Sequence, residues 1–197
     1  TVVYCAINGE FKGSIVISDK IKENAVEALI NLKKAGVKKT VMLTGDNKKT
    51  AYKVGEKINI DEVHSELLPL DKVKEVEEIM KRSNKNGKLA FVGDGVNDAP
   101  ALALSDVGMV FANDEQTAAS EAADIVLLGG NFSSVLYSIL SAKRTILIAK
   151  QSILWGIGLS IFCMILAALG YIPPLAGSLI QEAIDVAVIL NALRAAR

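Results

Sequence analysis

Ten residues near the middle of the chain, Phe91-Val92-Gly93-Asp94-Gly95-Val96-Asn97-Asp98-Ala99-Pro100, carry the clearest indication of a binding site. They continue a short apolar run that starts at Leu89 and is typical of a buried strand. Pro100 suits the first turn of a helix. Asp94 and Asp98 therefore follow a predicted strand at its C-terminal end, where open α/β sheets bind their ligands.

The residue types in this stretch favour magnesium and phosphate chemistry. Two carboxylates, Asp94 and Asp98, present hard oxygens that suit Mg²⁺, an ion that usually keeps several waters and binds substrate phosphates. Asn97 adds a neutral donor for a phosphoryl oxygen. The alternative interpretation is an acidic, glycine-rich turn without chemistry, and the rest of the sequence has to decide between the two.

Composition excludes some classes of protein. The 197 residues contain 22 Lys and Arg against 22 Asp and Glu, so no overall basic field predicts a nucleic-acid partner. The mean hydropathy of +0.35 is high for a soluble domain, and the apolar excess lies beyond about residue 145. Cys5 and Cys163 lie far apart and form no CxxC pair, which argues against a disulfide framework and a zinc knuckle.

The periodicity along the chain predicts strands that alternate with helices. Asn8-Gly9 is a strong hairpin signal, because both residues of such a turn adopt positive φ. Gly36 is a typical helix end. The alternation predicts an α/β fold with a doubly wound parallel sheet. Strands are expected at residues 1–7, 11–18, 39–43, 89–92, 107–111 and 125–128, and helices at 22–35, 48–58, 70–82, near 100 and 115–122. Residues 63–64 are too short to assign.

Two other segments supply groups for the same chemistry. Thr44-Gly45-Asp46 follows a predicted strand, so its hydroxyl and nearby backbone N–H groups are placed to hold an anion at the start of the next helix. Lys72 lies at the start of another helix, where a cation would neutralise charge on a transferring phosphoryl group. Each of these motifs alone is weak evidence for a phosphate site, but the three motifs in this order on alternating strands are a specific pattern.

The set Thr44-Gly45-Asp46-Asn47, Pro69-Leu70-Asp71-Lys72 and Gly93–Leu102 resembles the phosphorylation domain of P-type ATPases, within the haloacid dehalogenase superfamily. The resemblance implies that Mg²⁺ and ATP are the cofactors. It also implies the following roles: Thr44, with Gly45 and Asp46, contacts the phosphoryl group, Lys72 stabilises it, Asn97 orders the site, and Asp94 and Asp98 serve Mg²⁺.

The family's nucleophile, an aspartate in an Asp-Lys-Thr-Gly-Thr motif, does not occur in this sequence; Asp19-Lys20-Ile21-Lys22 does not match it. We therefore expect residues 1–13 to be the last strands of a nucleotide-binding domain and residues 14–142 to be the C-terminal portion of the phosphorylation domain. The resemblance implies a missing N-terminal part of the same pump as a partner. This chain alone should be inactive.

The last quarter of the chain predicts a transmembrane hairpin at residues 143–197. Residues 151–172 form an uncharged segment that is long enough to cross a bilayer. Residues 175–193 form a second span after Pro173-Pro174. Basic residues flank the pair of spans and none lies between them, so both ends should be cytoplasmic. We expect an integral protein of the plasma membrane, with its phosphorylation domain in the cytoplasm. The flanking basic residues are Lys143, Arg144, Lys150, Arg194 and Arg197.

In the middle-outer half of the second span, Gln181, Glu182 and Asp185 mark a tentative site for a transported metal. Helical spacing places Asp185 on the same face as the other two. Charges at this depth are costly and usually mark an ion path, although a helix-packing contact is the alternative. Carboxylates suit a divalent cation better than Cu⁺, which prefers sulfur ligands such as those of Cys163 and Met164.

Asn191-Ala192-Leu193-Arg194 resembles the end of the heavy-metal-transporting branch of the family. The resemblance implies ATP-driven export of a divalent transition metal of the zinc, cadmium and cobalt class through an aspartyl phosphate. Gln181-Glu182-Ala183 matches neither metal motif of that branch, so the metal stays open. The alternatives are a membrane-tethered phosphatase and a non-catalytic fragment that pairs with an N-terminal half. His64, the only histidine, is interpreted as a solvated or satisfied surface residue.

Overall fold

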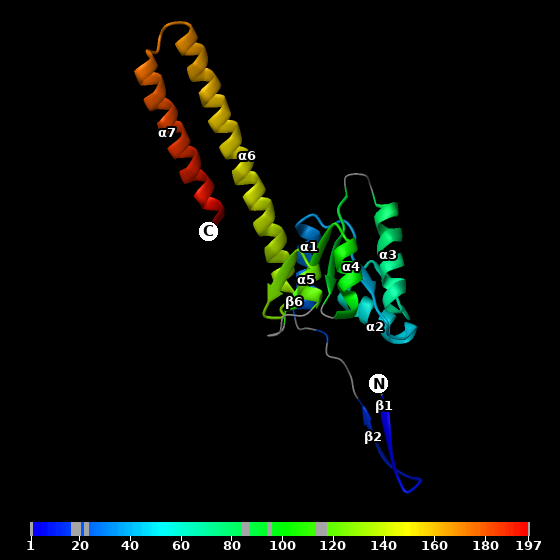
Figure 1. The fold of residues 1–197 in the computed structure, drawn as a ribbon. Helices are drawn as coiled ribbons and strands as arrows, with labels where there is room; N and C mark the ends of the chain where they lie inside the picture. Colours follow the sequence, from blue (N-terminus) through cyan, green and yellow to red (C-terminus); the bar gives the residue numbers. More distant parts are fainter. Residues whose placement is uncertain are drawn as a thin grey trace. The chain divides into compact units, whose positions relative to one another are not determined.

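The computed structural model describes residues 2–16, 21, 24–83, 87–93, 96–112 and 118–196. The chain divides into two compact units, Thr1–Leu136 and Tyr137–Arg197 (Figure 1). The predicted domain limits at residues 13 and 142 stay predictions. The elements in chain order are β1 (Val2–Ile7), β2 (Glu10–Val16), α1 (Ala25–Lys34), β3 (Val41–Leu43), α2 (Lys48–Ile58), β4 (Glu62–His64), α3 (Pro69–Arg82), β5 (Ala90–Gly93), η1 (Val96–Asp98), α4 (Ala99–Leu104), β6 (Val107–Ala112), α5 (Ala118–Ala122), β7 (Ile125–Leu128), α6 (Ser133–Ala168), α7 (Pro174–Ala192) and η2 (Leu193–Ala196).

The N-terminal hairpin has the turn that the sequence predicts. Strands β1 and β2 pair antiparallel. Asn8 and Gly9 have φ angles of 52° and 83°, as a type I′ turn requires. The register shifts between Cys5 and Ala6, where one strand bulges against the other.

The remaining strands are parallel and alternate with helices, which confirms the predicted fold class. They form two hydrogen-bonded ladders, β3–β4 and β5–β6–β7, where the sequence suggested a single sheet. The loop that starts at Thr44 follows β3, and η1 follows β5. Both predicted site segments therefore lie at C-terminal ends of parallel strands, where α/β folds bind ligands.

The core beside η1 depends on close packing of α4 against β6. Leu102 and Val110 are each 1% exposed, with Phe91 and Ala123 against them. A Cβ on Gly108 would lie 2.7 Å from the backbone oxygen of Leu102, so glycine is required for this approach. The packing anchors the short helix that follows the central stretch.

The second unit holds two long apolar helices that satisfy the length and composition of membrane spans. Helix α6 has 36 residues and is about 54 Å long, well beyond a hydrocarbon core of about 30 Å. It begins at Ser133 and ends at Ala168 and contains most of the predicted first span, 151–172, whose limits stay a prediction. Gly170, at a φ of 84°, stops the helix, and α7 begins at Pro174, close to the predicted residue 175.

Candidate functional site

The central stretch folds as a strand, a 3-10 turn and a short helix. Strand β5 ends at Gly93, and η1 leads directly into α4. Asn97 is exposed, whereas Asp98 is buried, with 8% of its surface exposed. Asp94 lies outside the described residues, so its part in Mg²⁺ binding stays a prediction. Asp98 is therefore the acidic group whose surroundings define the site.

Asp98 pairs with Lys72, which the sequence placed at the start of a helix. Lys72 Nζ lies 2.9 Å from Asp98 Oδ1, and the two side chains are 20% and 11% exposed. Charges that lose hydration in this way need a partner, and removal of one leaves the other uncompensated. The structure thus brings together two predicted site residues from separate motifs.

The first turn of α3 explains why Lys72 needs this partner. Pro69 occupies a first-turn position, and Asp71 Oδ2 accepts a hydrogen bond of 3.3 Å from the Leu68 backbone N–H. The positive end of the helix dipole disfavours a cation here. Asp98 offsets that cost. A lysine next to a helix N-terminus also attracts an anion, because both carry positive charge.

Gly93 makes room for Asp98. A Cβ on Gly93 would lie 3.0 Å from both Cβ and Oδ2 of Asp98. A larger residue at this position would therefore push the Asp98 side chain by a few tenths of an ångström. The sequence pattern identified Gly93 as part of a turn, but this clearance depends on the folded backbone.

The Thr44 loop is connected by its backbone to the start of α3. The Thr44 N–H donates to His64 O at 3.0 Å, and the Leu67 N–H donates to Thr44 O at 3.1 Å. Thr44 Oγ1 accepts from the Asp46 N–H at 3.1 Å. A Cβ on Gly45 would lie 3.3 Å from Leu67 O, so this approach favours glycine. The loop and the segment that enters α3 therefore form one hydrogen-bonded unit.

The three motifs are connected to different degrees. Lys72 and Asp98 are in contact, whereas for Thr44, Gly45 and Asp46 no hydrogen bond or ion pair to either of them is found in the described part of the chain. Within the same residues, no three His, Cys, Asp or Glu side chains gather as a metal-binding group. The buried carboxylate of Asp98 fits Mg²⁺, since that ion takes few protein ligands and completes its shell with water and phosphate oxygens.

On α7 the structure brings two predicted polar residues together. Gln181 Nε2 donates to Asp185 Oδ1 at 3.1 Å, which confirms that they share a helix face. Glu182, the residue after Gln181, is exposed. Their role as ligands of a transported metal stays a prediction.

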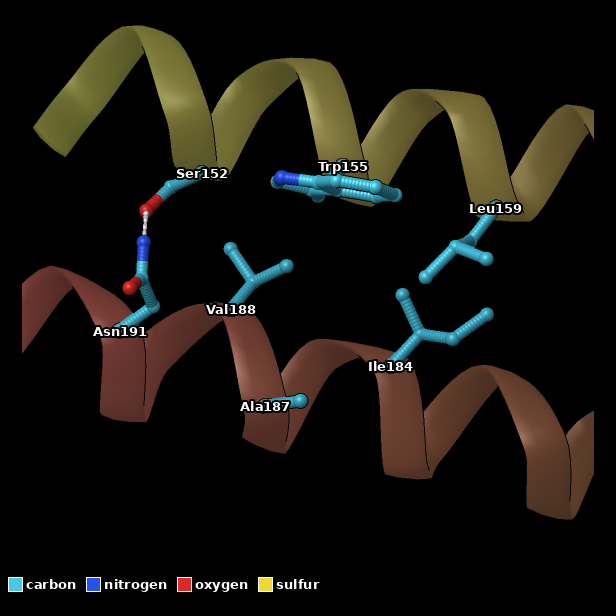
Figure 2. Close-up of a pocket in the computed structure, with 7 residues that line it drawn as sticks. All are labelled: Ser152, Trp155, Leu159, Ile184, Ala187, Val188 and Asn191. Carbon is cyan, nitrogen blue, oxygen red and sulfur yellow. Dashed lines mark hydrogen bonds between the residues drawn. The ribbon is translucent and has the colours of Figure 1, made fainter. Parts of the chain in front are cut away.

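A cavity of about 200 Å³ lies between α6 and α7 (Figure 2). At one end, Asn191 Nδ2 donates to Ser152 Oγ at 2.8 Å, and Ser152 is buried. The remaining walls are apolar and are formed by Trp155, Leu159, Ile184, Ala187 and Val188. The hydrogen bond joins the two helices of the hairpin.

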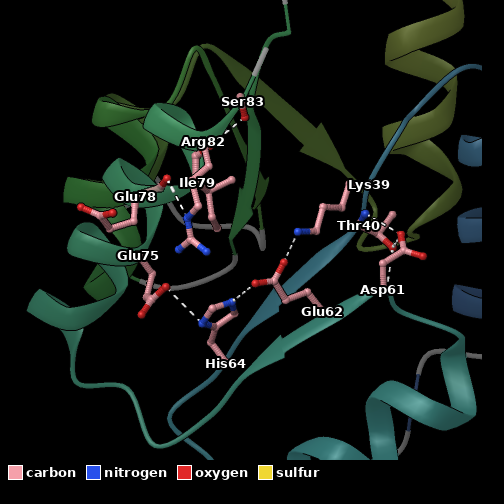
Figure 3. A network of polar contacts seen from close by, with 10 residues as sticks. All are labelled: Lys39, Thr40, Asp61, Glu62, His64, Glu75, Glu78, Ile79, Arg82 and Ser83. Carbon is pink, nitrogen blue, oxygen red and sulfur yellow. Dashed lines mark hydrogen bonds and ion pairs between the residues drawn. The ribbon is translucent and has the colours of Figure 1, made fainter.

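Sequence analysis missed a network of charged groups around His64 (Figure 3). His64 Nε2 lies 2.9 Å from Glu62 Oε1, and Nδ1 lies 3.1 Å from Glu75 Oε2. Lys39 also pairs with Glu62. Hydrogen bonds from Lys39 and then from His64 lower the pKa of Glu62 below its ordinary value. His64 is thus a satisfied residue, as predicted, but its two carboxylate partners come from separate elements and left no local signal.

A second acidic group fixes the entry to β3. Asp61 Oδ1 lies 2.6 Å from Lys33 Nζ. Asp61 Oδ2 accepts from the N–H and hydroxyl of Thr40 at 2.8 and 2.7 Å, and Figure 3 shows these two residues together. The hydrogen bonds from Lys33 and Thr40 lower the pKa of Asp61 to about 2. This group stabilises the fold and is not part of the phosphate site.

Comparison with known proteins gives a family match over residues 1–106, to the haloacid dehalogenase-like hydrolases. Over all 197 residues the chain is 40% identical to the cadmium, zinc and cobalt-transporting ATPase of Bacillus subtilis, covering 28% of that protein. It is 36% identical over the same length to a copper-exporting P-type ATPase of Staphylococcus haemolyticus, covering 24% of it. The chain thus spans about a quarter of the length of these curated relatives.

A solved structure matches the whole chain. The crystal structure of a zinc-transporting PIB-type ATPase in the E2.Pi state aligns with a TM-score of 0.84 and 32% sequence identity. The alignment covers 100% of this chain and 31% of that protein. The resemblance to P-type ATPases of the heavy-metal branch is therefore confirmed for both parts of the chain.

Proposed function

The chain belongs to the haloacid dehalogenase-like hydrolase family, and on that premise we propose that it is part of an ATP-driven pump for a transition-metal cation. In this proposal the first unit supplies the Mg²⁺ and phosphate site, and the second supplies two membrane spans. The observation that carries the proposal is the partly buried Lys72–Asp98 pair, on a chain that also contains two apolar helices of membrane-spanning length.

Lys72 has the position required to stabilise a phosphoryl group. Its ammonium group lies at the N-terminus of α3, so a phosphoryl oxygen would meet the cation and the positive end of the helix together. Fixed positive groups of this kind stabilise charge as it develops in the transition state. When the anion arrives, Lys72 can share its protons between that anion and Asp98, because an ammonium group has three donors.

Asp98, with Asp94, would hold Mg²⁺ next to this lysine. The ion, when bound, would neutralise phosphate charge and polarise a phosphoryl oxygen. Thr44 would contribute its hydroxyl proton, since in the described contacts Thr44 Oγ1 acts as an acceptor. Gly45 and Asp46 would shape the loop, and Asn97, exposed on η1, would donate to a phosphate oxygen. The attacking aspartate would come from another segment of the pump.

The hairpin would contribute to the membrane path. Exposed apolar side chains cover most of α6 and α7, which suits contact with lipid or with other spans. Gln181, Glu182 and Asp185 would face the path of a divalent cation such as Zn²⁺, Cd²⁺ or Co²⁺, because carboxylates suit a divalent cation better than soft Cu⁺. Both hairpin ends and the phosphate site would be cytoplasmic, and we propose the plasma membrane as the location.

The test is metal-stimulated ATP hydrolysis by the pump that contains this chain, purified in detergent. We expect stimulation by one or more of Zn²⁺, Cd²⁺ and Co²⁺, measured against Ni²⁺, Fe²⁺ and Cu⁺. The matched control is Lys72→Ala, which should abolish hydrolysis with every metal. Stimulation by Cu⁺ alone would contradict the divalent assignment. Hydrolysis of small phosphoesters without stimulation by any metal would contradict the pump and favour a membrane-tethered phosphatase.

A further inference from the structure

The contacts of His64 place a constraint on its protons. Both ring nitrogens face carboxylate oxygens, Nε2 at 2.9 Å from Glu62 and Nδ1 at 3.1 Å from Glu75. An ionised carboxylate only accepts hydrogen bonds, and a neutral imidazole has one donor nitrogen. Both contacts can be hydrogen bonds only when the ring carries two protons. The three side chains are between 19% and 28% exposed, so water replaces these bonds only in part.

This imidazole joins two segments of the proposed phosphate site. Its side chain contacts Glu75, one helical turn after Lys72 on α3. Its backbone oxygen accepts the N–H of Thr44. Figure 3 shows the ring between the strand β4 and the helix α3. The position of α3 relative to the Thr44 loop is thus linked to the charge on one ring.

We propose that His64, in its doubly protonated form, is a positioning residue that holds the Lys72 helix beside the Thr44 loop and makes the phosphate site sensitive to pH. The proposal rests on the function proposed above. His64 itself does not touch the phosphoryl group in this proposal. It acts through α3 and through the backbone of Thr44.

The neighbouring charges decide which contact is lost on deprotonation. Loss of one ring proton removes one of the two donors. The groups that face it are Glu62, which Lys39 already neutralises, and Glu75. With one donor left, one carboxylate faces a ring nitrogen lone pair. Because Lys39 already compensates Glu62, the remaining N–H donates to the uncompensated Glu75. The contact that holds α3 to β4 then changes from a charge-assisted hydrogen bond to a weaker one with a neutral donor.

The test uses nuclear magnetic resonance on the ¹⁵N-labelled chain in detergent micelles. His64 is the only histidine, so its ring signals are unambiguous. We expect the backbone amides of Lys72 and Thr44 to shift with the same midpoint as the His64 ring between pH 5.5 and 8.5. If the Lys72 amide does not follow the ring, the proposal is wrong.

Two variants separate a proton-linked role from a structural one. In Glu75→Gln the amide side chain can accept from a protonated nitrogen or donate to an unprotonated one, so the attachment no longer depends on the proton. The Lys72 amide should then stop following the ring. Glu78→Gln makes the same charge change on the same helix, where Glu78 pairs with Lys81, and should leave the coupling intact. Coupling that persists in Glu75→Gln would overturn the proposal.

A phosphate titration distinguishes failure of this inference from failure of the proposed function. Inorganic phosphate is added with Mg²⁺, and binding is followed at the Lys72 amide. Between pH 6 and 8, the affinity of the unmodified chain should fall about threefold more than that of Glu75→Gln, a change typical of one partly exposed charged contact. The comparison removes the titration of phosphate itself. Absence of binding in both proteins at every pH would contradict the phosphate site, while the amide shifts would still decide the role of His64.

Discussion

The two units differ in the side chains that they expose. In the first unit the best-buried residues are apolar, such as Val76 and Leu102, and the charged site residues are paired. In the hairpin, large apolar residues such as Leu154 are exposed, while the polar Ser152 is buried. Water drives the first arrangement and lipid allows the second, because lipid gives no hydrophobic force between helices. Substitutions of the same type should therefore have different effects in the two units.

The largest effect is expected at the phosphate site. Asp98→Asn removes the charge that pairs with Lys72 and that would hold Mg²⁺, so Mg²⁺-dependent ATP hydrolysis by the pump should fall by roughly a hundredfold or more. The control is Asp106→Asn. Asp106 also pairs with a lysine, Lys88, and among the described residues it has no hydrogen bond or ion pair with a site residue. Equal losses in both variants would show that the effect is general destabilisation.

Loss of the carboxylate of Glu182, on α7, should affect the response to the transported metal and not the reaction with phosphate. Glu182→Ala should reduce ATP hydrolysis to the level without metal, but phosphorylation by inorganic phosphate should remain, because the phosphate site lies in the other unit. The control is Gln181→Glu, which keeps a ligating oxygen. Metal stimulation that survives in Glu182→Ala would exclude this residue from the transport site.

Glycine substitutions compare packing in the two units directly. Gly108→Ala places a Cβ against the Leu102 backbone and should lower the stability of the chain by about 2–3 kcal/mol. Gly158 lies on α6 with open space around it, so Gly158→Ala should disrupt no packing and should raise stability by about 0.5–1 kcal/mol through helix propensity. Calorimetry in detergent measures both. Similar losses would mean that α6 is packed more tightly than its exposure indicates.

A smaller effect is expected from the hydrogen bond between the helices. Ser152→Ala removes the acceptor of the Asn191 side chain and should weaken helix association by about 0.6 kcal/mol, the average for such bonds in membrane proteins. Ser178→Ala is the control, because Ser178 bonds its own helix at Leu175. Urea titration of the hairpin in micelles, followed by the fluorescence of Trp155, compares the two variants.

The smallest effect is expected at Asp61 and depends on pH. Its pKa is about 2 in the fold against an ordinary 3.8, so the fold gains stability from its charged form above pH 3.8. That contribution disappears as the pH falls toward 2. Asp61→Asn should therefore be less stable than the unmodified chain at pH 7, with the difference narrowing below pH 4. Thermal unfolding at a series of pH values tests this, and a constant difference would contradict the assignment.

Local pattern was sufficient to predict the type of nearly every element. Asn8-Gly9, the periodic apolar positions and Pro173-Pro174 act over a few residues, so a turn, a helix or a break follows without tertiary contacts. The long uncharged run after Lys150 likewise predicts a span from length alone. The motifs that predict Thr44, Lys72 and Asp98 as site residues are also local, and their place at strand ends follows from the alternation of elements.

Folding decided which of these residues touch and where the long helix begins. The pairing of Lys72 with Asp98, the clearance at Gly93 and the position of His64 between two carboxylates each join segments distant in sequence. Whether such side chains meet depends on backbone positions to within an ångström, which periodicity does not encode. Helix α6 begins at Ser133 because nothing in residues 133–150 breaks a helix, whereas hydropathy marks only the apolar part. The residue types were enough to predict magnesium and phosphate chemistry. Which of these side chains touch one another was decided only by the folded backbone.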